Sequence, residues 1–273
     1  MNNSKKTRRY GRVKQQNWKS LKRWNMKSRK VMMGGLKSSV VGVFKGNKQF
    51  HYHRLDNGAK YYGMAKEYEL PDGTHKFVNH GQGMMVCPNG EVYNGEWNHG
   101  KMSGKGKYTW PVGAFYEGEF KNFQKNGRGK MIWPDGQVYD GEWNHDKMNG
   151  KGKFTYPGGT VYEGEFKHDK INGICKITYP DGKLYEGEFK DDEKSGKGKM
   201  TWPNGTVYEG EWKGDKKNGR GKQTRPDGEV YEGEFRNDKK NGRGKITWPD
   251  GSVYEGEFKD DRHIKEEEDD DDE

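Results

Sequence analysis

Hydrophobic and polar residues alternate over short stretches of this chain. In the stretch 139–161, Tyr139 and Trp143 alternate with acidic residues, and Phe154 alternates with lysine and threonine. A period of two indicates a β-strand with one apolar face. The polar residues 144–149 between the two runs predict a loop. The stretch is therefore predicted to be a β-hairpin.

The same pattern returns every 23 residues, which is the mark of a repeat array. Most units close with Pro-Asp-Gly, where proline fixes φ and glycine tolerates a positive φ, so each turn passes the chain into the next hairpin. We predict an all-β fold: an elongated, single-layer antiparallel meander of 23-residue hairpins, a solenoid-like ribbon. The period is set by eight prolines and eight tyrosines: Pro88, Pro111, Pro134, Pro157, Pro180, Pro203, Pro226 and Pro249, and Tyr93, Tyr116, Tyr139, Tyr162, Tyr185, Tyr208, Tyr231 and Tyr254.

One face of the ribbon is predicted to carry the packing residues. Glycine is a poor strand residue, so its recurrence between the rings needs a reason. Without a Cβ, these positions let rings lie flat over the backbone and stack from unit to unit. A single layer is expected to leave part of this aromatic face exposed. The predicted packing residues are Tyr93, Trp97, Tyr116, Phe120, Tyr139, Trp143, Tyr162, Phe166, Tyr185, Phe189, Tyr208, Trp212, Tyr231, Phe235, Tyr254 and Phe258.

The other face places acids on the first strand of each hairpin and bases on the second. Antiparallel pairing is expected to bring Glu117 and Glu119 close to Arg128 and Lys130, and the same holds in the other units. Each such pair contributes about 0.2–1 kcal/mol. Lysines that have a carboxylate partner make a poor phosphate-binding stripe.

The unit beginning at Tyr162 departs from this plan. Cys175 replaces one strand glycine there, and Ile174 replaces the adjacent base. This unit is predicted to pack differently from its neighbours.

Charge divides the chain into segments. Residues 1–55 hold sixteen Lys or Arg and no acid, and 266–273 are eight consecutive acids, so the formal net charge of +9 describes the ends and not the middle. We predict a basic, flexible arm over 1–55. Further along come degenerate capping repeats over 56–92, seven full units and a half unit over 93–258, and an acidic tail over 259–273. Repulsion within the tail is expected to discourage end-to-end pairing.

The basic arm is the main candidate for binding. Its candidate residues are interleaved bases and aromatics, and three interpretations remain open: an acidic protein surface, which we favour, an anionic membrane surface, or non-specific contact with nucleic acid. Specific nucleic-acid recognition is not predicted, and whether the arm is helical stays open. The candidates are Lys5, Lys6, Arg8, Arg9, Arg12, Trp18, Lys19, Lys22, Arg23, Trp24 and Lys27.

No constellation for catalysis, metal binding or a cofactor appears in the sequence, so an enzyme is not predicted. The two cysteines, Cys87 and Cys175, are too few for a disulfide framework or a zinc site. The Gly-x-Gly pairs lie inside predicted strands, whereas a phosphate loop leads into a helix. No apolar run reaches the roughly 20 residues of a membrane-spanning helix. The first residues lack the apolar stretch of a secretory signal, so export is not expected. The expected location is cytoplasmic.

The phased motif resembles the MORN repeat (membrane occupation and recognition nexus). Residues 93–258 match it strongly and 61–92 weakly. The family usually has Gly in the hairpin loop and His before Gly-x-Gly, where this chain mostly has Asp and Asn; this affects any role of the histidine but not the fold. A representative unit reads Tyr208-Glu209-Gly210-Glu211-Trp212 with Gly219-Arg220-Gly221.

The resemblance implies a non-catalytic role. MORN arrays occur as scaffolds in cilia, flagella and the cytoskeleton, as membrane-contact modules, and beside lipid kinase or methyltransferase domains, for which this chain has no room. We therefore expect a scaffold that binds protein partners in a cytoskeletal or ciliary assembly. The alternative is a peripheral membrane adaptor that binds acidic phospholipids through the arm, at the cytoplasmic face of a membrane. Self-association through the aromatic face or the sheet ends is a further expectation.

Overall fold

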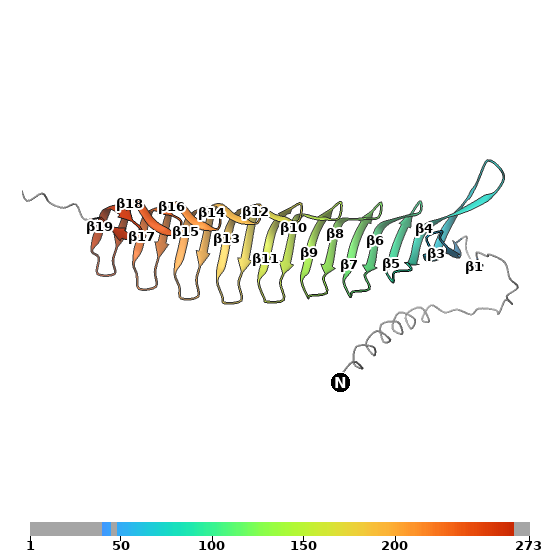
Figure 1. Ribbon diagram of the computed structural model, residues 1–273, viewed down its shortest axis with the longest axis horizontal. Helices are drawn as coiled ribbons and strands as arrows, with labels where there is room; N and C mark the ends of the chain where they lie inside the picture. Colours follow the sequence, from blue (N-terminus) through green and yellow to red (C-terminus); the bar gives the residue numbers. More distant parts are fainter. Residues whose placement is uncertain (1–39, 45–47, 265–273) are drawn as a thin grey trace, which may run out of the picture. The chain divides into compact units, whose positions relative to one another are not determined.

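A computed structural model describes residues 40–44 and 48–264, and they form one antiparallel sheet. Twenty strands, and no helix, are found among these residues. They belong to the unit Ser39–Glu273. Each strand pairs with the strand before it and the strand after it, so sequence order is also the order across the sheet (Figure 1). The predicted all-β meander of hairpins is confirmed.

The first strands extend the sheet into the segment predicted to be the flexible arm. β1 is Val40–Phe44 and β2 is Lys48–Arg54, and β2 pairs with β3, Lys60–Glu69. The predicted boundary at residue 55 is therefore wrong. The basic composition of this segment led to the prediction of a flexible arm, although it contains a strand. In that strand Phe50 is exposed and its neighbour His51 is almost fully buried. β4, His75–Val86, pairs with β3 in a hairpin longer than those that follow.

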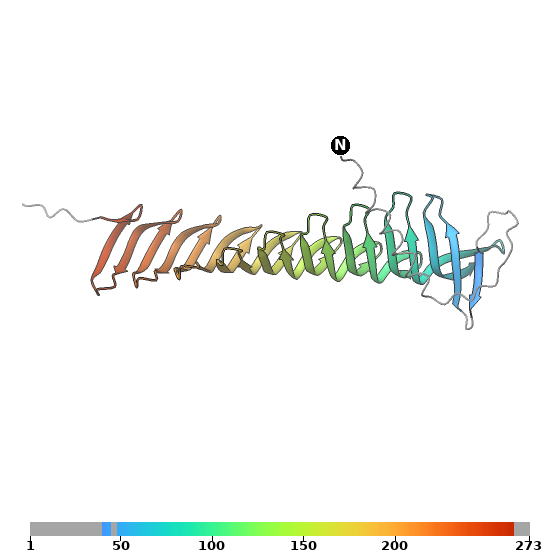
Figure 2. The same ribbon diagram turned by 90° about the horizontal axis from the view of Figure 1, so that it is seen from below.

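The remaining strands repeat with two lengths. First strands have seven residues and second strands nine, while the last strand, β20, has two. Successive hairpins follow one another along the ribbon in both views (Figure 2). The strands are β5 Val92–Asn98, β6 Lys101–Thr109, β7 Phe115–Lys121, β8 Gln124–Ile132, β9 Val138–Asn144, β10 Lys147–Thr155, β11 Val161–Lys167, β12 Lys170–Thr178, β13 Leu184–Lys190, β14 Glu193–Thr201, β15 Val207–Lys213, β16 Lys216–Thr224, β17 Val230–Arg236, β18 Lys239–Thr247, β19 Val253–Lys259 and β20 Arg262–His263.

The loop inside each hairpin is shorter than the sequence predicts. His145 and Asp146 alone connect β9 to β10, and their φ values of 49° and 66° are those of a two-residue type I′ turn. The predicted loop 144–149 is therefore wrong, because 147–149 are strand residues. Polar side chains there were mistaken for a loop because they precede a β-bulge, where the register of pairing shifts between Met148 and Gly152.

The bulge bends each hairpin toward its aromatic face. In β16, Nζ of Lys217 lies 2.8 Å from Oε1 of Gln223, six residues along the same strand. A straight strand would separate the two backbones by about 20 Å, more than the two side chains can span. The second strand is therefore folded at the bulge, between Lys217 and Gln223.

This bend gives the ribbon a buried core. Fourteen of the sixteen predicted packing residues lie in one buried cluster, and Tyr162 and Tyr254 are partly buried beside it. Side chains at the start of the second strands, such as Met102 and Lys240, are also buried and help to cover the tyrosines. The expectation of an exposed aromatic face is wrong for these rings, because each hairpin folds over its own tyrosine.

Each core tyrosine lies over a pair of glycines and contacts two neighbouring rings. A Cβ placed on Gly141 would come within 2.6 Å of the Tyr139 hydroxyl and of Cα of Gly152. The Tyr139 hydroxyl donates to the backbone carbonyl oxygen of Glu142 at 3.0 Å. Its ring meets Trp143 edge to face at 5.1 Å, and it meets Phe166 of the next repeat at the same distance. Ring contacts of this kind link one repeat to the next.

The aspartates of the hairpin turns connect successive repeats. The Asp146 carboxylate accepts a hydrogen bond from the backbone N–H of Lys125, 21 residues earlier, at 2.9 Å. In return, the N–H of Asp146 donates to the carbonyl oxygen of Lys125 at 3.0 Å. The same carboxylate bond is made at Asp169, Asp192, Asp215, Asp238 and Asp261.

The unit beginning at Tyr162 packs differently, as its sequence predicts. The side chain of Cys175 lies against Gly164, where tyrosine covers the corresponding glycine of other units. Among the described residues, Tyr162 does not make the bond to the carbonyl three residues ahead that its counterparts make. It instead approaches Tyr156, with ring centroids 5.6 Å apart. Burial raises the pKa of the Cys175 thiol to about 11, which leaves it protonated at neutral pH.

Candidate binding surface

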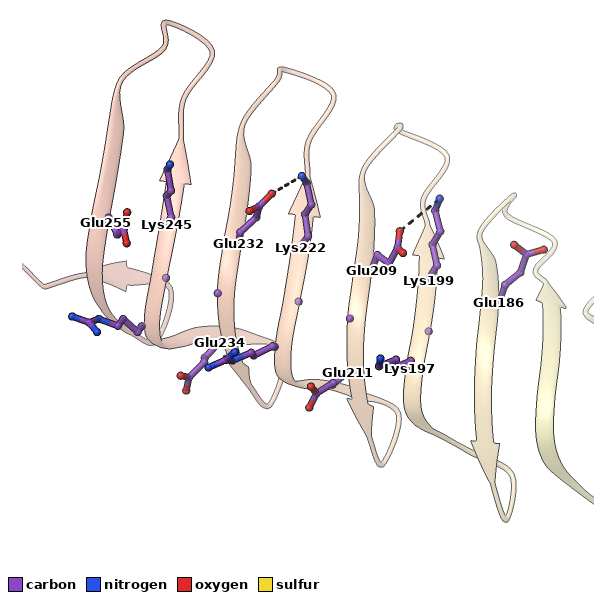
Figure 3. Close-up of a pocket in the computed structure, with 17 residues that line it drawn as sticks. Glu186, Lys197, Lys199, Glu209, Glu211, Lys222, Glu232, Glu234, Lys245 and Glu255 are labelled. Atoms are coloured by element: carbon purple, nitrogen blue, oxygen red, sulfur yellow. Dashed lines mark ion pairs between the residues drawn. The ribbon is translucent and has the colours of Figure 1, made fainter.

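The charged face of the last repeats contains a hollow of about 940 Å³. We refer to it as the charged hollow. Strands β13 to β19 supply its lining, and the acids and bases alternate from strand to strand (Figure 3). Glycines contribute the remainder of the surface: Gly198, Gly210, Gly221, Gly233 and Gly244. The Cβ positions of these glycines face the tyrosines on the other side of the sheet, so only their backbone lies between the charged rows.

The charges of the hollow are paired across neighbouring strands. Oε2 of Glu209 lies 4.0 Å from Nζ of Lys199, and Lys222 pairs with Glu232 in the same way one repeat later. These side chains are about half exposed or more. Exposed pairs of this kind contribute about 0–1 kcal/mol each to stability, so they are available to a partner without much loss to the fold.

Part of the predicted charge pairing is wrong. Glu117 lies opposite Lys130 in the register, as expected, but its ion pair is with Lys107 of the preceding repeat, at 3.2 Å. Glu119 does not pair with the Arg128 guanidinium. Its carboxylate instead accepts a hydrogen bond from the backbone N–H of Arg128 at 3.2 Å. At the bulge, three residues of β8 (126–128) stand opposite Glu119 alone, which places this glutamate over the bulge backbone.

Two functions of side chains were missed by reasoning from the sequence. The glutamate three residues after each core tyrosine covers the bulge glycine, as Glu142 does at Gly150, which has φ of 89°. The turn aspartates, interpreted from sequence only as residues suited to turns, also bond to the preceding repeat. Their strict recurrence at 23-residue intervals was a signal for both functions, since a turn alone tolerates several residue types.

The hollow has no net charge of its own. Six acids line it, Glu186, Glu209, Glu211, Glu232, Glu234 and Glu255, and six bases, Lys197, Lys199, Arg220, Lys222, Arg243 and Lys245. A surface that attracts phosphate needs an excess of bases. Alternating charges instead complement a protein segment that carries both signs.

The described residues contain neither a cluster of metal ligands nor a helix that could cross a membrane. No group of three or more His, Cys, Asp or Glu among them could hold a metal ion. Within the same part of the chain, no helix is long and apolar enough to cross a bilayer. Both cysteines there are free thiols.

The predicted binding residues of the basic arm, from Lys5 to Lys27, lie outside the described residues. The structure therefore neither groups them nor places them against the array. The charged hollow was not predicted as a site, because its residues have the same spacing in every repeat.

Comparison with protein families gives a match over most of the chain. The MORN repeat matches residues 80–92, 93–115, 116–138, 139–161, 162–183, 185–207, 208–230, 231–253 and 254–263. Most of these matches begin at a tyrosine of the 23-residue period. No curated protein matches the chain.

Solved structures show only a distant likeness. The G-box domain of the microcephaly protein CPAP is 14% identical with a TM-score of 0.37, over 71% of this chain and 99% of that domain. The TCP10 domain of Danio rerio CPAP is 14% identical with a TM-score of 0.29, over 80% of this chain and 94% of the domain. A catalytically inactive virginiamycin B lyase from Staphylococcus aureus is 12% identical with a TM-score of 0.18, over 80% and 87% of the two chains. At these scores the likeness carries no argument about function.

Proposed function

Because this chain belongs to the MORN repeat family, we propose that it is a non-catalytic scaffold whose repeat array binds protein partners in a cytoskeletal or ciliary assembly. The family supports interaction with proteins or membranes in general. The charged hollow is the observation that favours a protein. Its six acids and six bases alternate along the ribbon, which suits a polypeptide with both charges better than a phosphate-rich surface.

The proposal is tested by exchanging charges within the hollow. A variant with Lys199→Glu, Glu209→Lys, Lys222→Glu and Glu232→Lys keeps both ion pairs but reverses the pattern presented to a partner. The measurement is proximity labelling in cells with the full-length chain. The variant is expected to label fewer partners than the unchanged chain does. The matched control exchanges Lys107 and Glu117, an ion pair of the same kind outside the hollow. Equal partner sets for all three chains would exclude the hollow as the docking surface.

A second candidate is a peripheral membrane adaptor. It is favoured by residues 1–55, which hold sixteen bases and no acid. Each base near an anionic surface contributes about 1 kcal/mol. Co-sedimentation with vesicles of neutral and acidic phospholipid is expected to require acidic lipid, to weaken with salt, and to be lost from a chain without residues 1–39, a deletion that leaves the strands intact. Binding that survives this deletion would assign the lipid contact to the array.

A further inference from the structure

One row of side chains on the aromatic face stays partly exposed, along the edge where one repeat turns into the next. The row consists of the aromatic residues that precede proline in six repeats. Tyr156 is 41% exposed, and its counterparts are partly buried against the core. We call these residues the turn-edge row: Trp110, Trp133, Tyr156, Tyr179, Trp202 and Trp248.

The turns hold the row at regular intervals. The backbone N–H of Trp133 donates to the carbonyl oxygen of Gln137, and the N–H of Gly136 donates to the carbonyl oxygen of Trp133, both at 3.0 Å. The same two bonds recur at the other members of the row. Each repeat adds two strands, so successive row positions are about 9.6 Å apart along the ribbon.

This interval matches the repeat of a polyproline II helix, which rises 3.1 Å per residue with three residues per turn, or about 9.3 Å. We propose that the turn-edge row is a docking surface for a proline-rich segment of a protein partner, which lies along the ribbon as a polyproline II helix with proline at every third residue. One proline then reaches one ring in each repeat. The five consecutive rings from Trp110 to Trp202 accommodate about 13 residues. Aromatic-lined surfaces suit this ligand because it is already extended before binding.

Charge along the same edge defines the partner further. The turns between the five rings from Trp110 to Trp202 hold two carboxylates, Asp135 and Asp181, and one base, Lys183. Lys183 is paired with Asp181 at 2.9 Å, which leaves one carboxylate in excess. A segment that carries Lys or Arg between its prolines complements this small excess of negative charge.

Arg225 interrupts the row at the position of an aromatic ring. Beyond it the row continues at Trp248. The same repeat has Gln223 where its neighbours have Met200 and Ile246. The docking surface is therefore limited to the five rings before Arg225, and replacing this arginine by tryptophan is expected to lengthen it.

The turn-edge row and the charged hollow lie on opposite faces of the sheet. Gln223 points to the aromatic face, and its neighbour in sequence, Lys222, lines the hollow. Each surface can therefore bind or fail to bind a partner independently of the other. The test below uses a defined peptide and not the cellular partners of the proposed scaffold.

The experiment measures binding of synthetic peptides to the full chain by calorimetry. One peptide has proline at every third position and lysine among the intervening residues. The control peptide has the same length and composition in an order that places no two prolines three residues apart. The first is expected to bind at least about tenfold more tightly, because only its period follows the row. Equal affinities, or no binding by either peptide, would overturn the proposal.

Variants of the chain locate the contact. Tyr156→Arg is expected to weaken binding of the period-three peptide about fivefold, and Arg225 shows that the array holds arginine at this position. The matched control is Ile174→Arg, which adds the same charge on the opposite face, at a position where Arg128 stands in another repeat. Arg225→Trp is expected to tighten binding of a peptide extended by six residues. The proposal is wrong if Tyr156→Arg and Ile174→Arg change the affinity equally.

Discussion

At the scale of single residues, the absence of a side chain decides how the core forms. The paired glycines of neighbouring strands leave just enough space for a tyrosine ring, whose hydroxyl then reaches a backbone carbonyl. Burial raises the pKa of these tyrosines, so the ring is held neutral as well as covered. A position of this kind tolerates no other residue without movement of the ring or of the strands.

Gly141→Ala is expected to lower the free energy of unfolding by about 2–3 kcal/mol, because its Cβ would overlap the Tyr139 ring and the backbone of Gly152. The measurement is the urea midpoint followed by circular dichroism. Gly158→Ala is the control, since a Cβ there meets no atom within 4 Å. That change is expected to be neutral or to stabilise by less than about 1 kcal/mol. Equal effects of the two changes would contradict the packing account.

Cys175→Gly is expected to restore the standard packing of the aberrant unit. Removal of this side chain frees the surface of Gly164, so the Tyr162 ring can move onto the strand. Nitration of Tyr162 by tetranitromethane, measured by mass spectrometry, is expected to fall severalfold. Nitration of Tyr254, which is partly buried in a distant repeat, serves as the internal reference. Unchanged nitration of Tyr162 would show that Cys175 does not displace the ring.

At the scale of strands and turns, each hairpin is fixed by its own bulge and is tied to its neighbour by a turn aspartate. The bulge bends the second strand and divides it into two parts. The type I′ turn fixes the part that comes before the bulge. Six aspartates then bond to the repeat before them. The turn at Phe123 has no carboxylate, although its backbone makes the same bond to Met102 at 3.1 Å.

Phe123→Asp is expected to raise the free energy of unfolding by about 1 kcal/mol, since the new carboxylate can accept the N–H of Met102. Aspartate also suits the positive φ of 70° at this position better than phenylalanine does. Loss of the ring contact with Trp97, at 6.5 Å, opposes the gain only weakly. The check is the thermal midpoint, with Asp169→Phe expected to change it in the opposite direction. A lower midpoint for Phe123→Asp would refute the linking function of the aspartates.

At the scale of the whole array, the core is a line of rings with no second layer behind it. Tyr139 contacts Phe166, and Tyr208 contacts Phe235, each edge to face across a repeat boundary. Stability in such an array is a sum over neighbouring repeats.

The array is expected to unfold in alkali. Burial raises the pKa of Tyr162 and Tyr231 to about 12, above the 10.0 of exposed tyrosine. Their contribution to stability is therefore complete below pH 10 and is lost as the pH rises from 10 toward 12. Burial lowers the pKa of Lys125, Lys194 and Lys217, which raises stability with pH, but only until unfolded lysine loses its charge near pH 10.5.

The measurement is the urea midpoint as a function of pH, compared with tyrosine ionisation followed by ultraviolet absorbance. A cooperative loss of strand signal is expected together with ionisation. A midpoint that stays constant from about pH 9 to pH 12 would contradict the burial of the tyrosines.

The sequence by itself determined the period, the hairpins and the identity of the packing residues. Tyr139, Gly141 and Trp143 recur in phase, and a period of two has only one structural meaning over so many copies. The anomaly at Cys175 was readable for the same reason, because a Cβ replaces a glycine of the period. The sequence pattern is sufficient to predict the function of a residue that acts within its own strand or hairpin.

Only the tertiary structure shows the contacts between residues that are far apart in the chain. Burial of the rings depends on the bend at each bulge, and no pattern of hydrophobic and polar residues shows the direction in which a strand bends. The bond from Asp146 to Lys125 depends on the stacking of one repeat on another. The charged hollow and the turn-edge row are likewise surfaces that several repeats form together.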